Sequence, residues 1–225
     1  MRALVLFVGL ISISSFNYAQ RAELKSHCHE LTDLLKSDKP FHIQYTVTVK
    51  GKGENAEQGS INMDFYKSSL GEDFVMGSMQ EIIHKSNIEF LINHDQKAIV
   101  VKRDTTKSIA KNDMLNDLDQ FVDSAVTVKS SKKNSYITYI LEYPSSYIYQ
   151  KVEFVFNSHT KKLVTIYAEF AKDYHEPYAS MKVNYEVWDT SWKPDNTFPN
   201  IEKYLVLSGN SYQANNNYKN YKIHQ

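Results

Sequence analysis

The stretch from Gln58 to Lys102 constrains the fold most, because apolar and polar residues alternate along it again and again with no helical segment between. From Ile61 to Phe65 apolar residues take every second position, and turn-forming residues at 68–71 separate them from the next apolar run at 74–76. A period of two is the pattern of a half-buried strand. The stretch therefore predicts four or five sequential strands in an antiparallel meander.

The N-terminus has the pattern of a cleavable secretory signal. Arg2 precedes an apolar run from Ala3 to Ile13, and the small residue Ala19 stands before an expected cut at Gln20. The apolar run is shorter than the roughly 20 residues that a membrane-spanning helix needs, so we expect cleavage rather than anchoring. The only cysteine, Cys28, lies well after the cut, so no lipid anchor is expected. We therefore expect the protein to be periplasmic or secreted.

The composition favours one aromatic-rich β domain. We expect residues 1–19 to be the signal peptide and residues 20–225 to form a single domain with an extended tail at about 189–225. Tyr and Phe number 16 and 11, against 7 Gly and 5 Pro, which suits long strands. Lys plus Arg equals Asp plus Glu at 26 each, so no basic surface indicates a nucleic-acid partner.

Two helices are expected in this domain. Between Arg21 and Asp38, Leu24, Cys28, Leu31 and Leu35 form one stripe at helical spacing. A second amphipathic helix is expected at about 108–124. Cys28 lies on the apolar stripe, where an inert buried thiol is the usual role of a free cysteine.

The remaining pattern is again that of strands. Between Phe41 and Val49 apolar residues occupy every second position, which is the clearest alternation in the chain. Further strands are expected at 125–130, 136–143, 152–156, 163–170 and 180–188, followed by an extended segment at 197–204 and a short closing strand at 219–223. Each strand offers one apolar face to the sheet.

Motifs that carry chemistry are absent from the sequence. It contains no Gly-x-Ser-x-Gly, no His-Glu-x-x-His, no phosphate-binding glycine loop and no pair of Cys-x-x-Cys motifs. His27 and His29 flank Cys28, but residues i and i+2 point to different faces of a helix, so they do not form a metal site by themselves. We therefore expect no metal, no cofactor and no enzymatic activity. A nucleophilic pair of Cys28 with a histidine remains an alternative, because the two partners of such a pair are usually distant in the chain.

The order helix, long strand, hairpin, meander, helix, strands resembles that of the periplasmic outer-membrane lipoprotein carriers, the LolA-like superfamily. Three segments carry the likeness. Gln58–Lys67 has a glycine and then a strand ending in an aromatic residue and a lysine, while Phe90–Val101 and Val152–Val164 each have a strand, a turn and a return strand. The likeness covers most of residues 21–188, and the tail after Trp188 has no counterpart in the family pattern.

This resemblance implies an α+β fold that is mainly antiparallel β, an incomplete or half β-barrel whose open side about two helices cover. It also implies a non-enzymatic periplasmic carrier or binder of lipid or lipidated protein. The implied partners are lipid or lipoprotein acyl chains and membrane-associated donor or acceptor proteins. No binding residue of the family can be matched one for one in this sequence.

The candidates for an apolar ligand-binding surface come from the apolar sides of the expected strands. They are Tyr45, Val47, Ile61, Met63, Phe65, Phe74, Met76, Phe90, Phe154, Phe156 and Tyr185. If two helices cover the sheet incompletely, these residues line a pocket of the apolar kind that accepts a lipid. The alternative is a secreted structural or protein-interaction module in which the same residues form a filled β-shell and the aromatic, Asn-rich tail contacts the partner.

Overall fold

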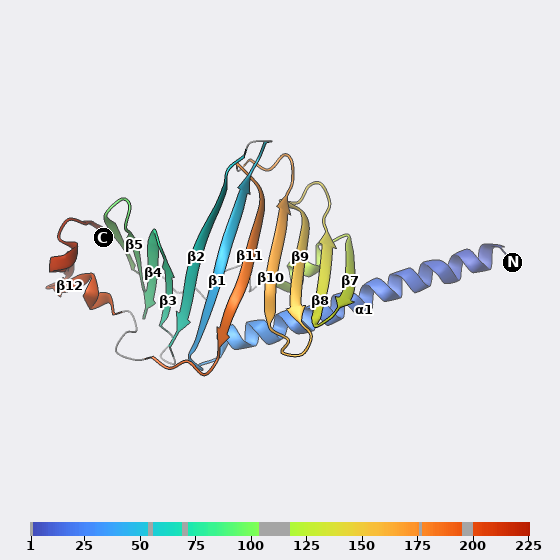
Figure 1. Cartoon of the computed structure of the whole chain (residues 1–225), viewed down its shortest axis with the longest axis horizontal. Helices are drawn as coiled ribbons and strands as arrows, with labels where there is room; N and C mark the ends of the chain where they lie inside the picture. Colours follow the sequence, from blue (N-terminus) through green and yellow to red (C-terminus); the bar gives the residue numbers. More distant parts are fainter. Residues whose placement is uncertain (1, 54–55, 69–71, 104–117, 176, 195–199) are drawn as a thin grey trace. The chain divides into compact units, whose positions relative to one another are not determined.

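The computed structural model describes residues 2–53, 56–68, 72–103, 118–175, 177–194 and 200–225, with the backbone alone for residues 2–17. The chain divides into two compact units (Figure 1). Unit 1 comprises Met1–Leu35, Val47–Ser60 and Asp113–Tyr185, and unit 2 comprises Lys36–Thr46, Ile61–Asn112 and Glu186–Gln225. Three long strands have one part in unit 1 and the other part in unit 2. They are β1 (Phe41–Gly51), β2 (Gln58–Lys67) and β11 (Tyr178–Asp189).

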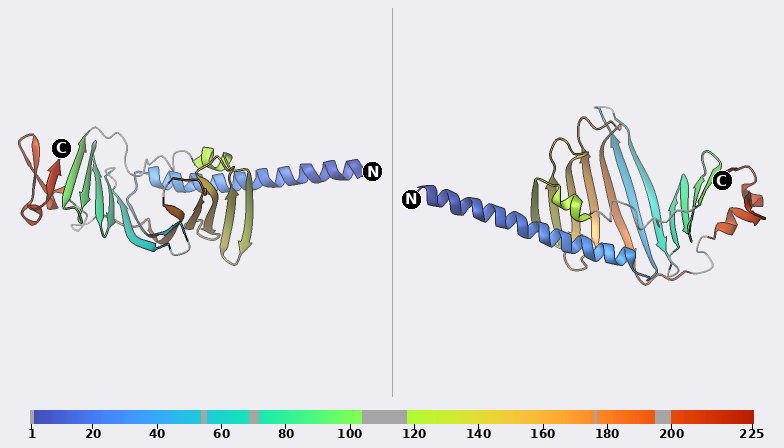
Figure 2. Two further views of the ribbon diagram at one scale, coloured as in Figure 1. Left: turned by 90° about the horizontal axis from the view of Figure 1, so that it is seen from above. Right: turned by 180° about the vertical axis from the view of Figure 1, so that it is seen from behind.

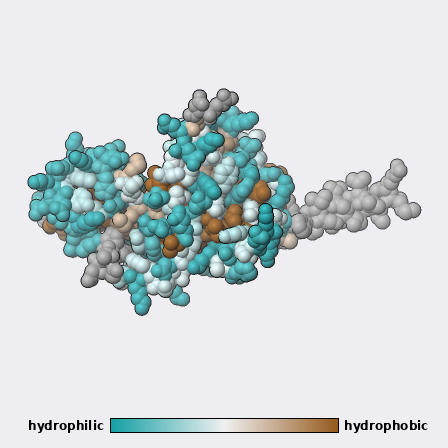
Figure 3. All heavy atoms as spheres, in the orientation of Figure 1, coloured by the Kyte–Doolittle hydropathy of each residue, from teal (hydrophilic) through white to brown (hydrophobic). Residues whose placement is uncertain are grey.

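Unit 1 is an antiparallel sheet with helices on one face. Its strands run in the order β11, β10 (Leu163–Phe170), β9 (Tyr149–Asn157), β8 (Tyr136–Glu142) and β7 (Thr127–Lys133). The helices α1 (Arg2–Lys36) and α3 (Leu118–Asp123) lie against the same side of these strands, as the view from behind in Figure 2 shows. The opposite side is a mixture of polar and apolar side chains over the middle of β8–β10 (Figure 3).

The core of unit 1 follows from the two periodicities. On α1, the buried residues Leu24, Cys28 and Leu35 form the stripe that the sequence predicted. On β9, Val152, Phe154 and Phe156 are all buried, at the period of two. The register places residues of β8 and β10 on the same face, and burial of each such large side chain contributes about 1.5–3 kcal/mol.

Arg21 ties the start of the packed part of α1 to the end of α3. Its guanidinium donates at 2.5 Å to the carbonyl oxygens of both Val122 and Ala125. The last carbonyl groups of a helix lack partners within the helix, so a cation there satisfies them and complements the helix dipole. The neighbouring Gln20 is also buried, with its side-chain amide beside the Val128 carbonyl group.

The strands of unit 2 form an antiparallel meander, and the C-terminal tail covers one face of it. The meander runs β2, β3 (Asp73–Gly77), β4 (Gln80–Lys85), β5 (Ile88–Asn93) and β6 (Ala98–Arg103), and β14 (Lys222–His224) pairs with β6 in parallel. The tail also forms the hairpin β12 (Leu205–Ser208) and β13 (Ser211–Ala214), and the short 3-10 helices Ile201–Lys203 and Asn216–Tyr218.

The tail completes the core of unit 2. Tyr204 and Leu205 are buried in one cluster with six residues of the meander, namely Phe74, Ile83, Phe90, Ile92, Ile99 and Val101. The Tyr204 hydroxyl donates to the buried carboxylate of Glu81, whose other oxygen lies 2.9 Å from His94 Nε2. The aromatic residues of the tail therefore pack on its own sheet.

The mainly antiparallel α+β architecture with two helices is confirmed among the described residues, while a half-barrel curvature stays a prediction. The first helix begins earlier than the expected Arg21, at Arg2. Of the expected second helix, 118–123 is helical and its start lies outside the described residues. The expected extended segment at 197–204 is wrong at its end, where a 3-10 helix forms, and the closing strand begins at Lys222 rather than Lys219.

Candidate functional site

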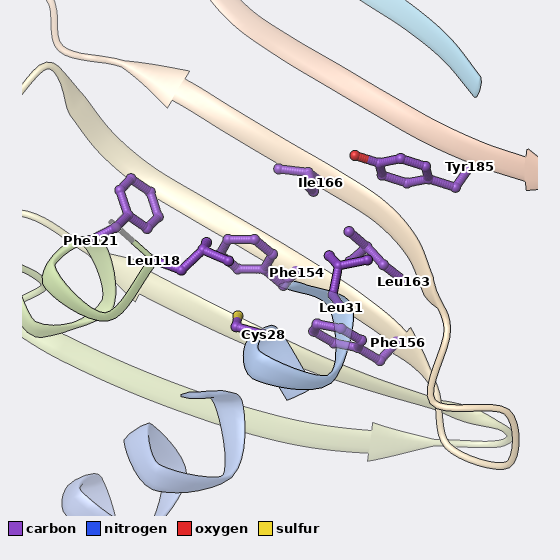
Figure 4. A pocket seen from close by; sticks show the side chains of 9 residues that line it. All are labelled: Cys28, Leu31, Leu118, Phe121, Phe154, Phe156, Leu163, Ile166 and Tyr185. Carbon is purple, nitrogen blue, oxygen red and sulfur yellow. The ribbon is translucent and has the colours of Figure 1, made fainter. Parts of the chain in front are cut away.

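The candidate site is a small apolar cavity in unit 1, between the two helices and the sheet. Figure 4 shows side chains from α1, α3, β9, β10 and β11 converging on it. The nine lining residues are Cys28, Leu31, Leu118, Phe121, Phe154, Phe156, Leu163, Ile166 and Tyr185. None of these side chains carries a charge, and the Tyr185 hydroxyl supplies their only oxygen. The arrangement can accept an apolar group and offers no acid, base or nucleophile in its reactive form.

The sulfur of Cys28 supports this conclusion, because its thiol is held in the neutral form. Cys28 is 1% exposed. Burial, with a smaller contribution from the Asp119 carboxylate, raises the pKa of the thiol to about 12. A thiol with such a pKa is not the thiolate that nucleophilic or metal-binding chemistry needs.

The cavity measures about 30 Å³, which is room for one or two water molecules and far below the roughly 300–1,000 Å³ of pockets that hold small ligands. The described part of α3, Leu118–Asp123, covers the cavity on one side. Besides Arg21, exposed pairs join α3 to α1, with Lys25 Nζ 2.7 Å from Asp123 Oδ2 and His29 Nε2 3.0 Å from Asp119 Oδ1. Exposed ion pairs contribute little free energy, about 0–1 kcal/mol each.

Of the eleven residues predicted to line a ligand site, the cavity brings together Phe154, Phe156 and Tyr185. The others lie elsewhere. Phe74 and Phe90 belong to the tail-covered cluster of unit 2, and Met76 packs against it. Phe65 is buried with its ring 5.5 Å from that of Phe41, whereas Ile61 is exposed and Tyr45, Val47 and Met63 are half-buried. A ligand contact for any of the eleven stays a prediction.

Sequence reasoning missed the helical contributors to the cavity wall. Leu31 and Cys28 were recognised as members of an apolar stripe, and the second helix, which carries Leu118 and Phe121, was recognised as amphipathic, but both helices were expected to supply packing residues. The apolar stripe of each helix could have indicated these residues. The side chains that pack on an apolar sheet face also line any cavity that is left between helix and sheet.

Two kinds of feature are absent from the described residues, a metal-binding cluster and a membrane-spanning helix. These residues contain no group of three or more His, Cys, Asp or Glu side chains placed to hold a metal ion. Within the same part of the chain, no helix combines the length and apolar character needed to cross a membrane.

Comparisons with known proteins give structural similarities only, since no family model and no curated protein matches the chain. A LolA superfamily protein from Nitrosomonas europaea is 13% identical, with 78% of this chain and 97% of that chain covered and a TM-score of 0.38. The lipoprotein LppX of Mycobacterium tuberculosis is 12% identical, with 80% of this chain and 98% of that chain covered and a TM-score of 0.42. A putative outer membrane lipoprotein-sorting protein domain from Vibrio parahaemolyticus is 8% identical, with 78% of this chain and 94% of that chain covered and a TM-score of 0.32.

One of these structures is a LolA superfamily protein, which is the superfamily whose pattern the sequence resembles. Because all three TM-scores lie below 0.5 and the identities below 25%, nothing that these proteins bind is transferred to the present chain. Its function has to follow from its own residues.

Proposed function

We propose that the protein is a non-enzymatic carrier or binder of lipid or lipidated protein, and that an acyl chain enters between α1, α3 and the strands β9 and β10. The supporting observation is the uncharged cavity at this place, whose walls are leucine, isoleucine and aromatic side chains. Each CH₂ group moved from water into such surroundings contributes about 0.8 kcal/mol. A chain of ten or more carbons therefore supplies enough free energy to displace a weakly held cover.

The cover is α3, and its displacement is part of the proposal because the cavity as it stands is too small for an acyl chain. Opening breaks the packing of the buried residues Leu118 and Val122 and of the Phe121 ring, which lies against four aromatic rings of unit 1. The apolar contacts of the ligand have to replace these contacts. The ligand then occupies the space between α1 and β9–β10 that α3 closes in its absence.

Filling the cavity tests this proposal. Ile166→Trp places a large ring in the cavity wall, and Ile148→Trp makes the same change at an exposed isoleucine. Titration with a fluorescent C16 fatty acid should saturate with the unaltered protein and with Ile148→Trp. Ile166→Trp should weaken the affinity at least tenfold while remaining folded, because overpacking costs about 1–3 kcal/mol. Equal affinity in all three proteins, or no saturable binding to the unaltered one, would contradict the proposal.

We further propose that the protein acts in the periplasm or outside the cell after cleavage before Gln20. The packing supports this boundary, because Tyr18 and Ala19 are exposed whereas Gln20 is buried and Arg21 binds the end of α3. An intact-mass measurement on protein from its own host would give the mass of residues 20–225 if this boundary is right. A mass that includes residues 1–19 would be evidence against it.

The structural or protein-interaction alternative is favoured by one observation in unit 2. There the apolar face of the meander is filled by Tyr204 and Leu205 of the tail rather than left open. In this alternative Phe74 and Phe90 serve stability alone. The fatty-acid titration separates the two functions, because a filled shell has no saturable site for an acyl chain.

A further inference from the structure

A second hollow in unit 1 lies at one end of β8, β9 and β10 and has a different character from the apolar cavity. It is a groove of about 350 Å³, which is within the size range of small-ligand sites. Its lining residues are Tyr143, Pro144, Ser145, Tyr149, Gln150, Ala171, Lys172 and Asp173. They come from the connection between β8 and β9, from the first two residues of β9 and from the turn that follows β10.

Backbone hydrogen bonds fix both walls of this groove. The Tyr147 amide donates to the Pro144 carbonyl oxygen at 2.9 Å and closes the first turn, and the Tyr174 amide donates to that of Ala171 at 3.0 Å and closes the second. The Ala171 amide joins the two walls by donating to Ile148 O at 3.0 Å. The groove is therefore preformed, which lowers the entropic cost of binding.

Aromatic rings support the groove from below. The rings of Tyr143 and Tyr147 are stacked with centroids 4.8 Å apart, and Phe170 and Tyr174 form a second stack at 5.1 Å. Tyr149 connects the two stacks, at 6.3 Å from Tyr147 and 5.4 Å from Phe170. Tyr143 and Tyr149 themselves line the groove. The negative face of an aromatic ring attracts weakly positive C–H groups, such as those on one face of a sugar ring.

The polar lining matches a neutral ligand with many hydroxyl groups. Gln150 offers an amide donor and acceptor, Lys172 a donor and Asp173 an acceptor, and all three side chains are exposed. The charges of Lys172 and Asp173 oppose each other, so the groove does not select an anion such as a phosphate or a fatty-acid carboxylate. The nearby ammonium of Lys52 donates to the carbonyl oxygens of Lys172 and Tyr174.

We infer that this groove binds a neutral saccharide of one or two rings, with a C–H face of the sugar against the half-buried ring of Tyr149 and its hydroxyl groups on Gln150, Lys172 and Asp173. The proposal is independent of acyl binding, because the groove and the apolar cavity share no lining residue. Phe121 stands between the two, since it lines the cavity and its ring lies 5.1 Å from Tyr143.

The test is an NMR titration of the full-length, isotope-labelled protein with maltose, cellobiose and N,N′-diacetylchitobiose, each in turn. A prolyl decapeptide serves as the competing ligand class, because aromatic grooves also bind extended proline-rich chains. The groove variants are Gln150→Ala and Asp173→Ala. The matched controls are Gln58→Ala and Asp95→Ala, which alter exposed residues of the same types that do not line the groove.

At least one disaccharide should shift the amide signals of residues 143–150 and 171–174 saturably. Each groove variant should weaken the affinity about tenfold, the expected loss for a hydrogen bond to an exposed ligand group, and each control should leave it within twofold. Failure of all three sugars to bind would overturn the inference, as would binding of the prolyl peptide alone or sugar shifts that the groove variants do not weaken. A separate fatty-acid titration reports on the apolar cavity, so failure of one site is distinguishable from failure of the other.

Discussion

At the scale of single residues, the reactivity of Cys28 is a direct prediction of its burial. Because its pKa is raised from 9.0 to about 12, the thiol stays protonated in the folded state when the unfolded chain already ionises. The folded state then binds more protons, so this group's contribution to stability is present below about pH 9 and is lost as the pH rises toward 12.

Alkylation by iodoacetamide at pH 8.5 should therefore be slow in buffer and fast in 6 M guanidinium chloride. The ratio of the two rates measures how rarely the site opens. Equal rates in the two solutions would mean that Cys28 is accessible and that α1 does not pack as described.

Arg21 is the residue whose removal should most weaken the attachment of α3 to α1 beside the cavity. Arg21→Ala takes away two 2.5 Å hydrogen bonds, to the carbonyl oxygen of Val122 in α3 and to that of Ala125 just after it. We expect a loss of about 1.5–3 kcal/mol in the free energy of unfolding. Lys161→Ala is the control, because its ion pair with Glu30 is exposed and should be worth about 0–1 kcal/mol. Urea denaturation gives both values. Similar losses for the two variants would contradict a capping role for Arg21.

At the scale of elements, the strands of the meander and the closing strand of the tail could be predicted from the sequence, but the rest of the tail could not. The five strands β2–β6 of the meander lie where alternation placed them, because burial of one sheet face leaves a period of two. The hairpin from Leu205 to Ala214 was missed, since its strands are four residues long and Val206 and Leu207 are exposed. The positive φ of Gly209, at +63°, is the local feature that allows its turn.

The buried Tyr204 is predicted to hold the tail on its sheet. Tyr204→Phe keeps the ring but removes the hydroxyl that donates to Glu81, a carboxylate that is 6% exposed. Loss of a hydrogen bond to a buried charged group should lower the free energy of unfolding by about 1.5–3 kcal/mol. Tyr136→Phe, at a residue that is 44% exposed, should change it by less than about 0.5 kcal/mol. Guanidinium denaturation compares the two variants, and a neutral Tyr204→Phe would show that the tail is held by apolar contacts alone.

At the scale of the whole molecule, the candidate site was accessible to sequence reasoning only in part. Period-two patterns identify the apolar face of every strand, and Phe154, Phe156 and Tyr185 were found in this way. The same pattern holds for Phe74 and Phe90, which the tail covers. Which apolar face is filled and which borders a cavity depends on contacts between distant segments, and a local pattern does not contain that information.

Native mass spectrometry of the protein purified from its own host tests acyl-chain binding most directly. We expect a second species that is heavier by the mass of one lipid or acylated molecule. That species should disappear at high collision energy and be much reduced in Ile166→Trp but not in Ile148→Trp, because only the former fills the cavity wall. A single unliganded mass for all three proteins, or an adduct that Ile166→Trp retains in full, would contradict the account.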